Sequence, residues 1–297
     1  MLFTIAIPCY NNVKTIGKAI RSAIHQDYIS EYEILVANNA STDGTKEQIE
    51  QFDCENLRVI NNPTTVNLFA NHNVCLREAK GDYVVFCHSD DELLPQALTI
   101  LEDRIKSRLF PQKYVLWGRS MFRDYARNLN EIGYRQNTIL AGEQAIDFFI
   151  MAPRGLTPSG TCYSRKSIIE LGGFDERLSS AILPHDWTIL MKAAMNCFEF
   201  EQMDRMIFKR LDASTAKTTN AMEVVIKEHQ NAIALFLEDL SAEERKHYKD
   251  FVISCCSLYH YEFWKPFFSD AEKKQIYKRL AGRSIKKKIR LYRFFKD

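Results

Sequence analysis

Strand-like apolar runs alternate with amphipathic helical patterns through about the first 120 residues, the rhythm of a layered α/β domain. The predicted strands are Leu2–Ile7, Glu33–Ala37, Leu57–Ile60 and Tyr83–Cys87, and the predicted helices are Val13–Gln26, Thr45–Phe52 and Val66–Ala79. Elements in this order form a mostly parallel sheet with helices on both faces. We therefore predict an α/β fold of that kind.

Three of the predicted strands end in clusters of polar residues. Ile7 is followed by Pro8–Asn12, Ala37 by Asn38–Gly44, and Cys87 by His88–Glu92. Ligands of open α/β sheets bind outside the carboxyl ends of the strands. We therefore expect the functional residues to lie in these loops.

The pattern changes after about Tyr114. It predicts strands near Tyr114–Gly118 and Gly160–Ser164, a helix at Glu143–Met151, a helix that stops at Gly172–Gly173 and another that begins after Asp186. Beyond Ala216 nearly all of the pattern is helical and rich in aromatic residues. We predict one domain over residues 1–215, built of two halves (1–118 and 119–215), and a helical subdomain over 216–297.

Composition and charge narrow the class of protein. Hydrophobic residues make up 46% and charged residues 26% of the chain, which excludes disordered, collagen-like and coiled-coil proteins. The most apolar segment, Phe251–Phe268, contains charged residues and Pro266, so no membrane span is predicted. The N-terminus lacks the features of a signal peptide, and the eight cysteines form no C-x-x-C pair. We expect a cytoplasmic protein with reduced thiols.

Charge is divided unevenly along the chain. Residues 273–297 hold eleven Lys or Arg and one Asp, whereas residues 1–272 hold 29 basic and 37 acidic side chains. A basic tail on an acidic body predicts contact with an anionic surface. We expect peripheral attachment to the inner face of the cytoplasmic membrane, and no nucleic-acid partner. The alternative is a solvated helix whose apolar side packs on the helical subdomain.

The segment His88–Asp91 offers carboxylates directly after a predicted strand. Carboxylate oxygens hold Mg²⁺ or Mn²⁺ and leave positions open for substrate phosphates. Helix capping is the alternative interpretation, because Pro95 suits a first helical turn. Asn38–Thr45 follows another predicted strand, and its Asx and Ser side chains suit a turn that caps the next helix. Asp186 either caps the predicted helix after it or takes a proton from an attacking hydroxyl.

Taken together, these motifs resemble the family 2 glycosyltransferases of the GT-A fold. The matching segments, in the family's order, are IPCYNN from Ile7, QDY from Gln26, EILVANNASTDGT from Glu33, AKGDYVVFCHSDDELLP from Ala79, GGFDE from Gly172 and HDW from His185. The resemblance covers roughly residues 1–215, and it implies that 1–118 is the nucleotide-sugar half and 119–215 the acceptor half. It implies a nucleotide-diphosphate sugar donor, Mg²⁺ or Mn²⁺, and inversion at the anomeric carbon.

The resemblance also implies roles for single residues. It puts the nucleotide against Pro8, Tyr10 and Asn11, with Asn38 near the base, Asp43 supporting its loop, Asp90 on the metal and Asp186 as the base. We expect His88, Ser89 and Asp91 to bind the nucleotide sugar beside Asp90. The predicted acceptor or phosphate side comprises Ser159, Gly160, His185, Trp187 and Arg210.

The chain departs from the family at several of these positions. The family usually has Asp where His88 stands and often Arg where His72 stands, and Asn38 and Asn39 replace a pair of acids or an acid and Asn. An Asn38 amide donates and accepts, so we predict a pyrimidine donor with cytidine included.

The expected activity is therefore metal-dependent, non-processive transfer of a sugar to a glycan acceptor. We expect this acceptor to be linked to a lipid and to serve the synthesis of a bacterial surface polysaccharide. A non-catalytic sugar-nucleotide or glycan-binding module is the alternative. A nucleotidylyltransferase is less favoured because Pro8–Asn12 contains no glycine.

Overall fold

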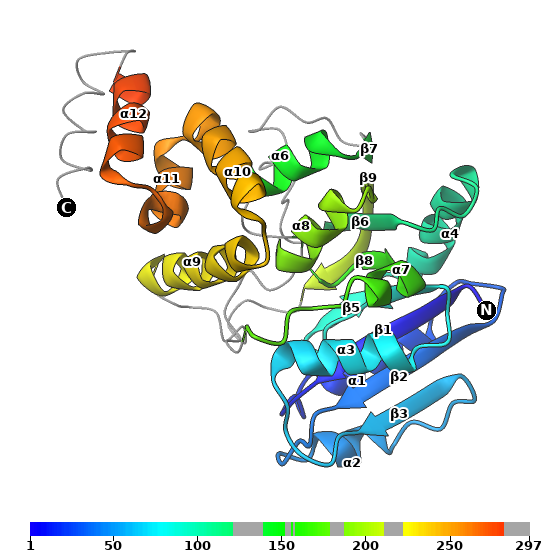
Figure 1. Ribbon diagram of the computed structural model, residues 1–297. Helices are drawn as coiled ribbons and strands as arrows, with labels where there is room; N and C mark the ends of the chain where they lie inside the picture. Colours follow the sequence, from blue (N-terminus) through cyan, green and yellow to red (C-terminus); the bar gives the residue numbers. More distant parts are fainter. Residues whose placement is uncertain (121–138, 152–155, 157, 179–186, 211–221, 282–297) are drawn as a thin grey trace. The chain divides into compact units, whose positions relative to one another are not determined.

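The computed structural model describes the chain except for residues 121–138, 152–155, 157, 179–186, 211–221 and 282–297 (Figure 1). The chain divides into two compact units, one of residues 1–181 and 185–219 and the other of residues 182–184 and 220–297. Each unit is described by itself below.

The first unit holds the sheet and its helices. Its strands are β1 (Phe3–Cys9), β2 (Tyr32–Asn38), β3 (Leu57–Asn61), β4 (Tyr83–Phe86), β5 (Asp91–Leu93), β6 (Tyr114–Ser120), β7 (Ile139–Leu140), β8 (Thr161–Ser164) and β9 (Glu199–Arg210). Its helices are α1 (Ile16–Ile24), α2 (Thr45–Ile49), α3 (Leu68–Glu78), α4 (Ala97–Ser107), α6 (Glu143–Met151), α7 (Arg165–Glu170) and α8 (Trp187–Met195).

Within the described residues the strands form one mixed sheet in the order β3-β2-β1-β4-β8-β6-β9-β5, with β7 beside β9. Strands β3, β2, β1 and β4 run parallel, whereas β8 is antiparallel to both β4 and β6. The register pairs Cys9 with Asn38 and Asn38 with Asn61. The carboxyl ends of β1, β2 and β3 therefore lie at one edge, which confirms the expected sheet.

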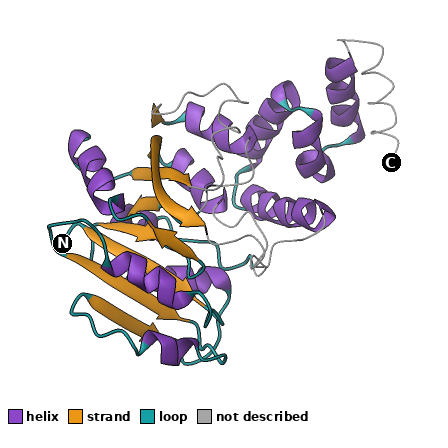
Figure 2. Ribbon diagram, turned by 180° about the vertical axis from the view of Figure 1, so that it is seen from behind, coloured by secondary structure: helices purple, strands orange, loops and turns teal. Residues whose placement is uncertain are grey.

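Helices cover both faces of the parallel strands, as the opposite views of Figures 1 and 2 show. Every residue of β1 is buried, which explains why its sequence is almost continuously apolar. Helix α1 buries Ile16, Ile20 and Ala23 on one stripe. Fully burying an isoleucine side chain contributes about 1.5–3 kcal/mol, so this stripe fixes α1 against the sheet.

Strands β5 and β9 were not predicted from the sequence. Asp91 opens β5, which pairs with β9 in antiparallel register, and α4 begins only after Gln96, which forms no side-chain cap. The capping interpretation of His88–Asp91 is therefore wrong. The sequence pattern did not reveal β9, because a charged residue of this strand, Glu201, is fully buried. Glu201 accepts hydrogen bonds from Arg104 and from the Tyr114 hydroxyl.

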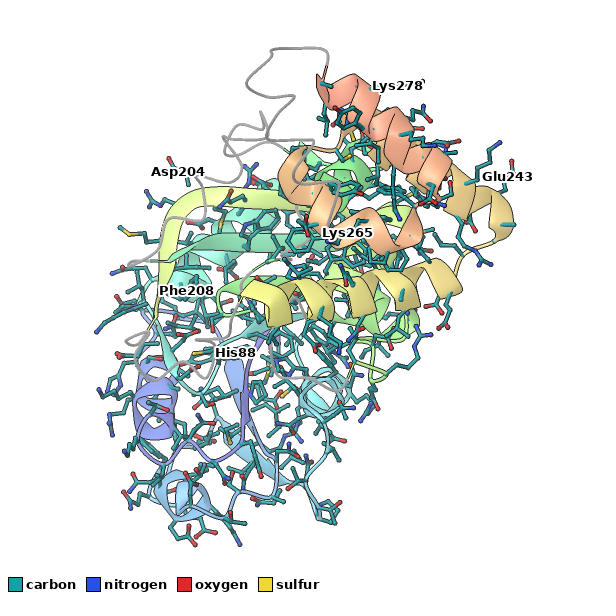
Figure 3. The ribbon with its side chains drawn as sticks, turned by 90° about the vertical axis from the view of Figure 1, so that its left-hand side faces the viewer. His88, Asp204, Phe208, Glu243, Lys265 and Lys278 are labelled. Carbon is teal, nitrogen blue, oxygen red and sulfur yellow. The ribbon has the colours of Figure 1, made fainter. Side chains whose placement is uncertain are left out.

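The second unit is helical. Its elements are α9 (Met222–Glu238), α10 (Ala242–Cys255), α11 (Leu258–Trp264), a 3-10 turn (Lys265–Phe267) and α12 (Asp270–Ala281). Ser241 and Glu244 form a reciprocal capping box that starts α10. Exposed Glu243 and Lys278 mark α10 and α12 in Figure 3. Among the described helices none has both the length and the apolar character needed to span a bilayer.

Candidate active site

Hydrogen bonds join the loops that follow β1 and β2. The Asn11 N–H donates to the Ser41 hydroxyl (3.0 Å), and the Asn11 side-chain oxygen accepts from the Thr42 N–H (2.9 Å). Asn11 has a φ of 53° and Ala40 a φ of 51°, in the left-handed region that asparagine tolerates better than most residues. Tyr10 is 40% exposed at the end of β1, and Pro8 pairs with Ala37. These contacts fix the two loops against each other.

Asn12 adds the loop after β4 to this pair. Its side-chain oxygen accepts a hydrogen bond from the Ser89 hydroxyl (2.9 Å), and its N–H donates to the Thr45 hydroxyl (2.8 Å). One asparagine of the loop after β1 thus contacts the loop that follows β4 and the first residue of α2, where the loop after β2 ends. The structure brings together the three polar clusters that the sequence indicated.

Amide contacts orient Asn38 and Asn39 at the end of β2. The Asn38 side-chain nitrogen donates to the Asn61 oxygen (2.8 Å), and its oxygen accepts from the Ser41 N–H (3.3 Å). Asn39 forms two hydrogen bonds with the backbone of Val66, 2.8 and 2.9 Å long. Both asparagines are at most 4% exposed. Burial and these bonds hold the two amides in one orientation.

Asp43 supports the start of α2. Its carboxylate accepts hydrogen bonds from the Thr45 hydroxyl, the Thr45 N–H and the Val13 N–H. Desolvation raises the pKa of this exposed carboxyl, but these hydrogen bonds outweigh it, so the pKa lies below its ordinary value. Asp43 therefore stays ionised and braces the loop that leads into α2, whose N-cap residue is Gly44.

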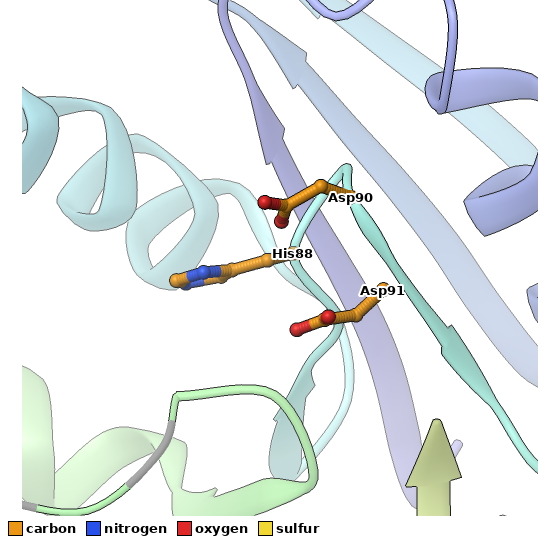
Figure 4. Close-up of side chains that lie close together, drawn as sticks. All are labelled: His88, Asp90 and Asp91. Carbon is orange, nitrogen blue, oxygen red and sulfur yellow. The ribbon is translucent and has the colours of Figure 1, made fainter. Parts of the chain in front are cut away.

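His88, Asp90 and Asp91 form a group with the spacing of a cation site. One ring nitrogen of His88 and one oxygen of each carboxylate lie within 4.8 Å of one another. Figure 4 shows the three side chains around the turn after β4, with the His88 side chain passing between those of Asp90 and Asp91 and its ring extending beyond both carboxylates. The Asp91 N–H donates to the His88 carbonyl (2.9 Å), which closes the turn. Two carboxylates and an imidazole fit a divalent cation.

His88 also contacts His72 on α3. The two Nε2 atoms are 3.1 Å apart, and the Nδ1 of His72 is 2.7 Å from the Leu68 carbonyl oxygen. His72 is 3% exposed, and its ring packs against Phe86 and Phe174. Two of the positions at which this chain differs from the family pattern are therefore in contact.

Ser159 and Gly160 lie beside the turn after β4. The Ser159 hydroxyl accepts a hydrogen bond from the His88 N–H (2.9 Å), and the Gly160 N–H donates to the Phe86 carbonyl (3.0 Å). Gly160 has a φ of +76°, and a Cβ there would lie 2.5 Å from the ring of Phe208, which Figure 3 labels on β9. Only glycine fits this position.

The predicted base and part of the predicted acceptor side lie outside the described residues. Asp186 is that base and His185 that part of the acceptor side, and for Arg210 only the backbone pairing with Asp91 is described. Trp187, at the start of α8, is fully buried, and its indole N–H donates to the Phe149 carbonyl (2.7 Å). The indole packs in the core, and contact of Trp187 with an acceptor stays a prediction.

Sequence reasoning assigned no role to Asn12 or to the contact between His72 and His88. Asn12 belongs to the recognised PCYNN segment, but periodicity does not reveal that its side chain reaches the loop after β4. His72 lies 16 residues before His88, on another element. The sequence signal that could have drawn attention to His72 is that it replaces the arginine often found there in the family.

Comparison with known proteins agrees with this fold. The sequence profile described as "Glycosyl transferase family 2" matches residues 4–169. An uncharacterised protein, MT1568 of Mycobacterium tuberculosis, is 27% identical over 214 residues, which cover 66% of this chain and 64% of that protein. The GalNAc(5)-diNAcBac-PP-undecaprenol beta-1,3-glucosyltransferase of Campylobacter jejuni is 32% identical over 33% of this chain and 32% of its own length. The matches thus span less than two thirds of these relatives.

Two solved structures share the architecture. Staphylococcus aureus TarS 1–349 in complex with UDP-GlcNAc superposes with a TM-score of 0.68 at 21% identity, over 94% of this chain and 80% of that one. The mannosyltransferase PcManGT of Pyrobaculum calidifontis, in complex with GDP-Man and Mn²⁺, gives 0.62 at 16% identity, over 98% and 78%. These likenesses show the GT-A fold. Since the family profile matches more than half of the sequence, the chain belongs to glycosyl transferase family 2.

Proposed function

We propose that this protein transfers a sugar, with inversion, from a nucleotide-diphosphate donor to a hydroxyl of a glycan acceptor. The observation that carries the proposal is the group of His88, Asp90 and Asp91, joined through Ser89 and Asn12 to the loops after β1 and β2. A cation-compatible group beside such loops suits a nucleoside diphosphate.

In the proposed reaction, Asp186 accepts the proton of the acceptor hydroxyl. The hydroxyl oxygen forms a bond to the anomeric carbon, and the bond from that carbon to the diphosphate oxygen breaks with its electron pair. A bound Mg²⁺ or Mn²⁺, held by Asp90, would neutralise the charge that develops on the diphosphate. The transfer is proposed to be non-processive.

The proposed donor carries a pyrimidine base, with Asn38 reading its edge. Asn38 has one amide nitrogen and one oxygen oriented by Asn61 and Ser41, which leaves further donor and acceptor capacity on the same amide. Pro8, Tyr10 and Asn11 are the proposed walls of the nucleotide site, with Asp43 as a brace. Ser159, Gly160, His185, Trp187 and Arg210 remain the proposed acceptor or phosphate side.

The proposed acceptor is lipid-linked, in the synthesis of a bacterial surface polysaccharide. The Campylobacter relative bears the name of an enzyme whose acceptor is linked to undecaprenol through a diphosphate, which supports this choice. The basic residues of the tail support peripheral attachment to an anionic leaflet, which would bring the site to such an acceptor.

The proposal is tested by a transfer assay. The purified protein is incubated with Mn²⁺, with UDP-, dTDP-, CDP- or GDP-sugars and with a synthetic polyprenyl-diphosphate-linked sugar, and products are weighed by mass spectrometry. We expect a product one sugar heavier with a pyrimidine donor. Asp90→Ala abolishes it, while Asp103→Ala, at an exposed position on α4, leaves it intact.

Donor turnover without any acceptor is followed in parallel as release of nucleoside diphosphate. If a nucleotide sugar binds but neither transfer nor release occurs across the panel, the non-catalytic binding module is correct instead. If transfer continues at the same rate in EDTA, the cation has no part in it.

A further inference from the structure

Helix α1 carries basic residues along the side that faces away from the sheet. Lys14, in the turn that leads into the helix, and Lys18, Arg21 and His25 are all exposed. At 3.6 residues per turn, these four positions fall within a sector of about 60°. The opposite side of α1 is buried against the sheet. The four residues therefore form a separate surface, which we call the α1 basic row.

The cations of the α1 basic row are not paired with acids among the described residues. Exposed lysines on α2 and α4 form ion pairs with acids one turn away on their own helices. No ion pair within 4.0 Å holds Lys14, Lys18 or Arg21 in the part of the chain that the structure describes. The Arg21 guanidinium lies over the Phe52 ring, 5.8 Å from its centroid, a contact that does not use its N–H donors. These charges are accessible to an external anion.

The acidic groups beside the row are mostly held by other partners. Asp43 accepts hydrogen bonds at the start of α2 and of the turn before α1. Glu50 of α2 pairs with Lys46 at 3.7 Å. Glu47, also on α2, is exposed and lies outside ion-pair distance of the row. The row is thus locally positive, although residues 1–272 carry more acidic than basic side chains.

The row begins beside the candidate site. Lys14 is two residues from Asn12, whose carbonyl accepts the N–H of Ile16 at 2.9 Å and so starts the first turn. Helix α1 connects β1 to β2, so this turn lies at the sheet edge formed by the loops after those strands. From Lys14 to Arg21 the row runs about 10 Å, at 1.5 Å per residue. An anionic surface in contact with the row therefore lies next to the site.

We propose that the α1 basic row docks on the headgroups of an anionic phospholipid leaflet, as a second contact beside the basic tail. The inference rests on the proposed function, since the partner is the leaflet that would carry a lipid-linked acceptor. Sites for small ligands are concave, whereas a convex helix face suits a flat charged surface. Two separate contacts fix the orientation of the domain, so that the site edge stays beside the leaflet.

The number of cations sets the strength of this contact. A Lys or Arg close to an anionic leaflet raises the affinity about fivefold, so three of them raise it about 100-fold. This is weaker than the marginal attachment that one myristoyl chain provides. The row alone is therefore not expected to hold the protein on vesicles, and its effect appears in the full chain, where it multiplies the affinity of the tail.

Acetylation of lysines tests the contact directly. The full-length protein is acetylated to a low extent, in solution or bound to phosphatidylglycerol vesicles at low salt, and each lysine is quantified by mass spectrometry. We expect slower acetylation of Lys14 and Lys18 on the vesicles. Acetylation of Lys80 and Lys166 is expected to be unchanged. These two exposed lysines lie after α3 and on α7, and α3 covers the opposite face because the connection from β3 to β4 crosses back along the sheet.

Removal of charge tests the same contact through the affinity for vesicles. Lys14→Gln combined with Lys18→Gln is expected to weaken binding of the full chain to phosphatidylglycerol vesicles about 25-fold, at about fivefold per cation. Lys80→Gln combined with Lys166→Gln removes the same charge elsewhere and is the matched control, expected to weaken binding far less. Titration with UDP checks that the candidate site is intact in both variants.

The outcomes separate this inference from the proposed function. If the full chain binds vesicles but Lys14 and Lys18 react as they do in solution, the row does not face the leaflet, while the glycosyltransferase proposal stands. If inorganic polyphosphate protects these lysines and vesicles do not, the partner is a soluble polyanion and the leaflet is wrong. If the chain binds no anionic vesicle, both membrane contacts are refuted, and the transfer assay still decides the proposed function.

Discussion

Asn12 shows how a single side chain assembles the candidate site. Its oxygen accepts hydrogen bonds from the Ser89 hydroxyl and the Tyr10 N–H, and its own N–H donates to the Thr45 hydroxyl. Two of these three bonds depend on the amide oxygen. The geometry of three loops therefore depends on one residue that carries no proposed chemistry.

Replacing Asn12 by Ala is expected to lower both stability and nucleotide affinity. Losing two hydrogen bonds costs about 1–3 kcal/mol at roughly 0.5–1.5 kcal/mol each. Asn12→Asp keeps an acceptor oxygen and serves as the matched variant. Urea unfolding measures stability, and UDP titration measures affinity; if Asn12→Ala equals the wild type in both, the bridging role of Asn12 is refuted.

Replacing Asp186 by Asn tests the proposed base at the same scale. The variant is expected to bind donor normally but to transfer sugar ~10²–10⁴-fold more slowly, because a general base typically contributes that factor. Single-turnover kinetics with saturating donor separates binding from chemistry. Transfer at a near wild-type rate would remove Asp186 from the mechanism.

At the scale of elements, Asp175 connects the turn after α7 to α8. Its carboxylate accepts hydrogen bonds from the Arg177 guanidinium, 2.6 and 2.9 Å long, and lies 3.8 Å from Lys192 of α8. The hydrogen bonds from Arg177 lower the pKa of Asp175 against an opposing effect of desolvation, and Lys192 adds to the lowering. This carboxylate therefore links the turn after α7 to α8.

The lowered pKa of Asp175 sets a pH dependence of stability. Its native pKa is below the ordinary value of 3.8, so its contribution is fully present above that value and is lost as the pH falls through the native pKa. Asp175→Asn is therefore expected to be less stable than the wild type at pH 7, with the difference shrinking at more acidic pH. Urea unfolding from pH 7 down to pH 3 measures it; a constant difference would contradict the account.

The strongly periodic elements were predictable, and the exceptions have physical reasons. Strand β1 is a nearly continuous apolar run, and the apolar residues of α1 recur about every 3.6 positions. Both patterns are clear because both elements pack in the hydrophobic core. Strand β9 buries Glu201 with Arg104 and Tyr114, so its polar letters conceal a core strand. Asp91 looked like a loop residue because β5 is three residues long and its partner lies more than a hundred residues away.

The site was predictable in its location and less so in its contacts. The carboxyl ends of the parallel strands β1, β2 and β4 lie close together in the sheet. The alternation of strands and helices along the sequence was enough to predict this. The approach of His72 to His88 depends on how α3 packs across Phe86, a tertiary detail that no local pattern encodes. Roles of Asp186 and of the acceptor residues rest on the family resemblance and remain proposals.

At the scale of the whole molecule, the uneven charge distribution leads to a prediction about membranes. Residues 282–297, which lie outside the described part, contain seven Lys or Arg and one Asp. Each basic residue near an anionic leaflet contributes about 1 kcal/mol, and salt weakens the attraction. The full chain is therefore expected to co-sediment with vesicles that contain phosphatidylglycerol, and much less so at high salt.

A chain shortened to Ala281 is the matched variant, because it keeps α12 and the hydrogen bond from Arg279 to the Cys256 carbonyl. It is expected to remain in the supernatant at the same salt concentration. Vesicles of phosphatidylcholine alone are the control for nonspecific pelleting. Equal binding of both chains, or binding indifferent to salt, would refute attachment through the tail.

The central claim is that the edge formed by the loops after β1, β2 and β4 binds a nucleoside diphosphate through a divalent cation at Asp90. Calorimetric titration with UDP, dTDP, CDP and GDP, with Mn²⁺ and then with EDTA, tests it most directly. We predict that a pyrimidine diphosphate binds best and that EDTA and Asp90→Ala each weaken it at least tenfold, about 1.4 kcal/mol, while Asp103→Ala does not. Affinity unchanged by EDTA and by Asp90→Ala, or a clear preference for GDP, would contradict the account.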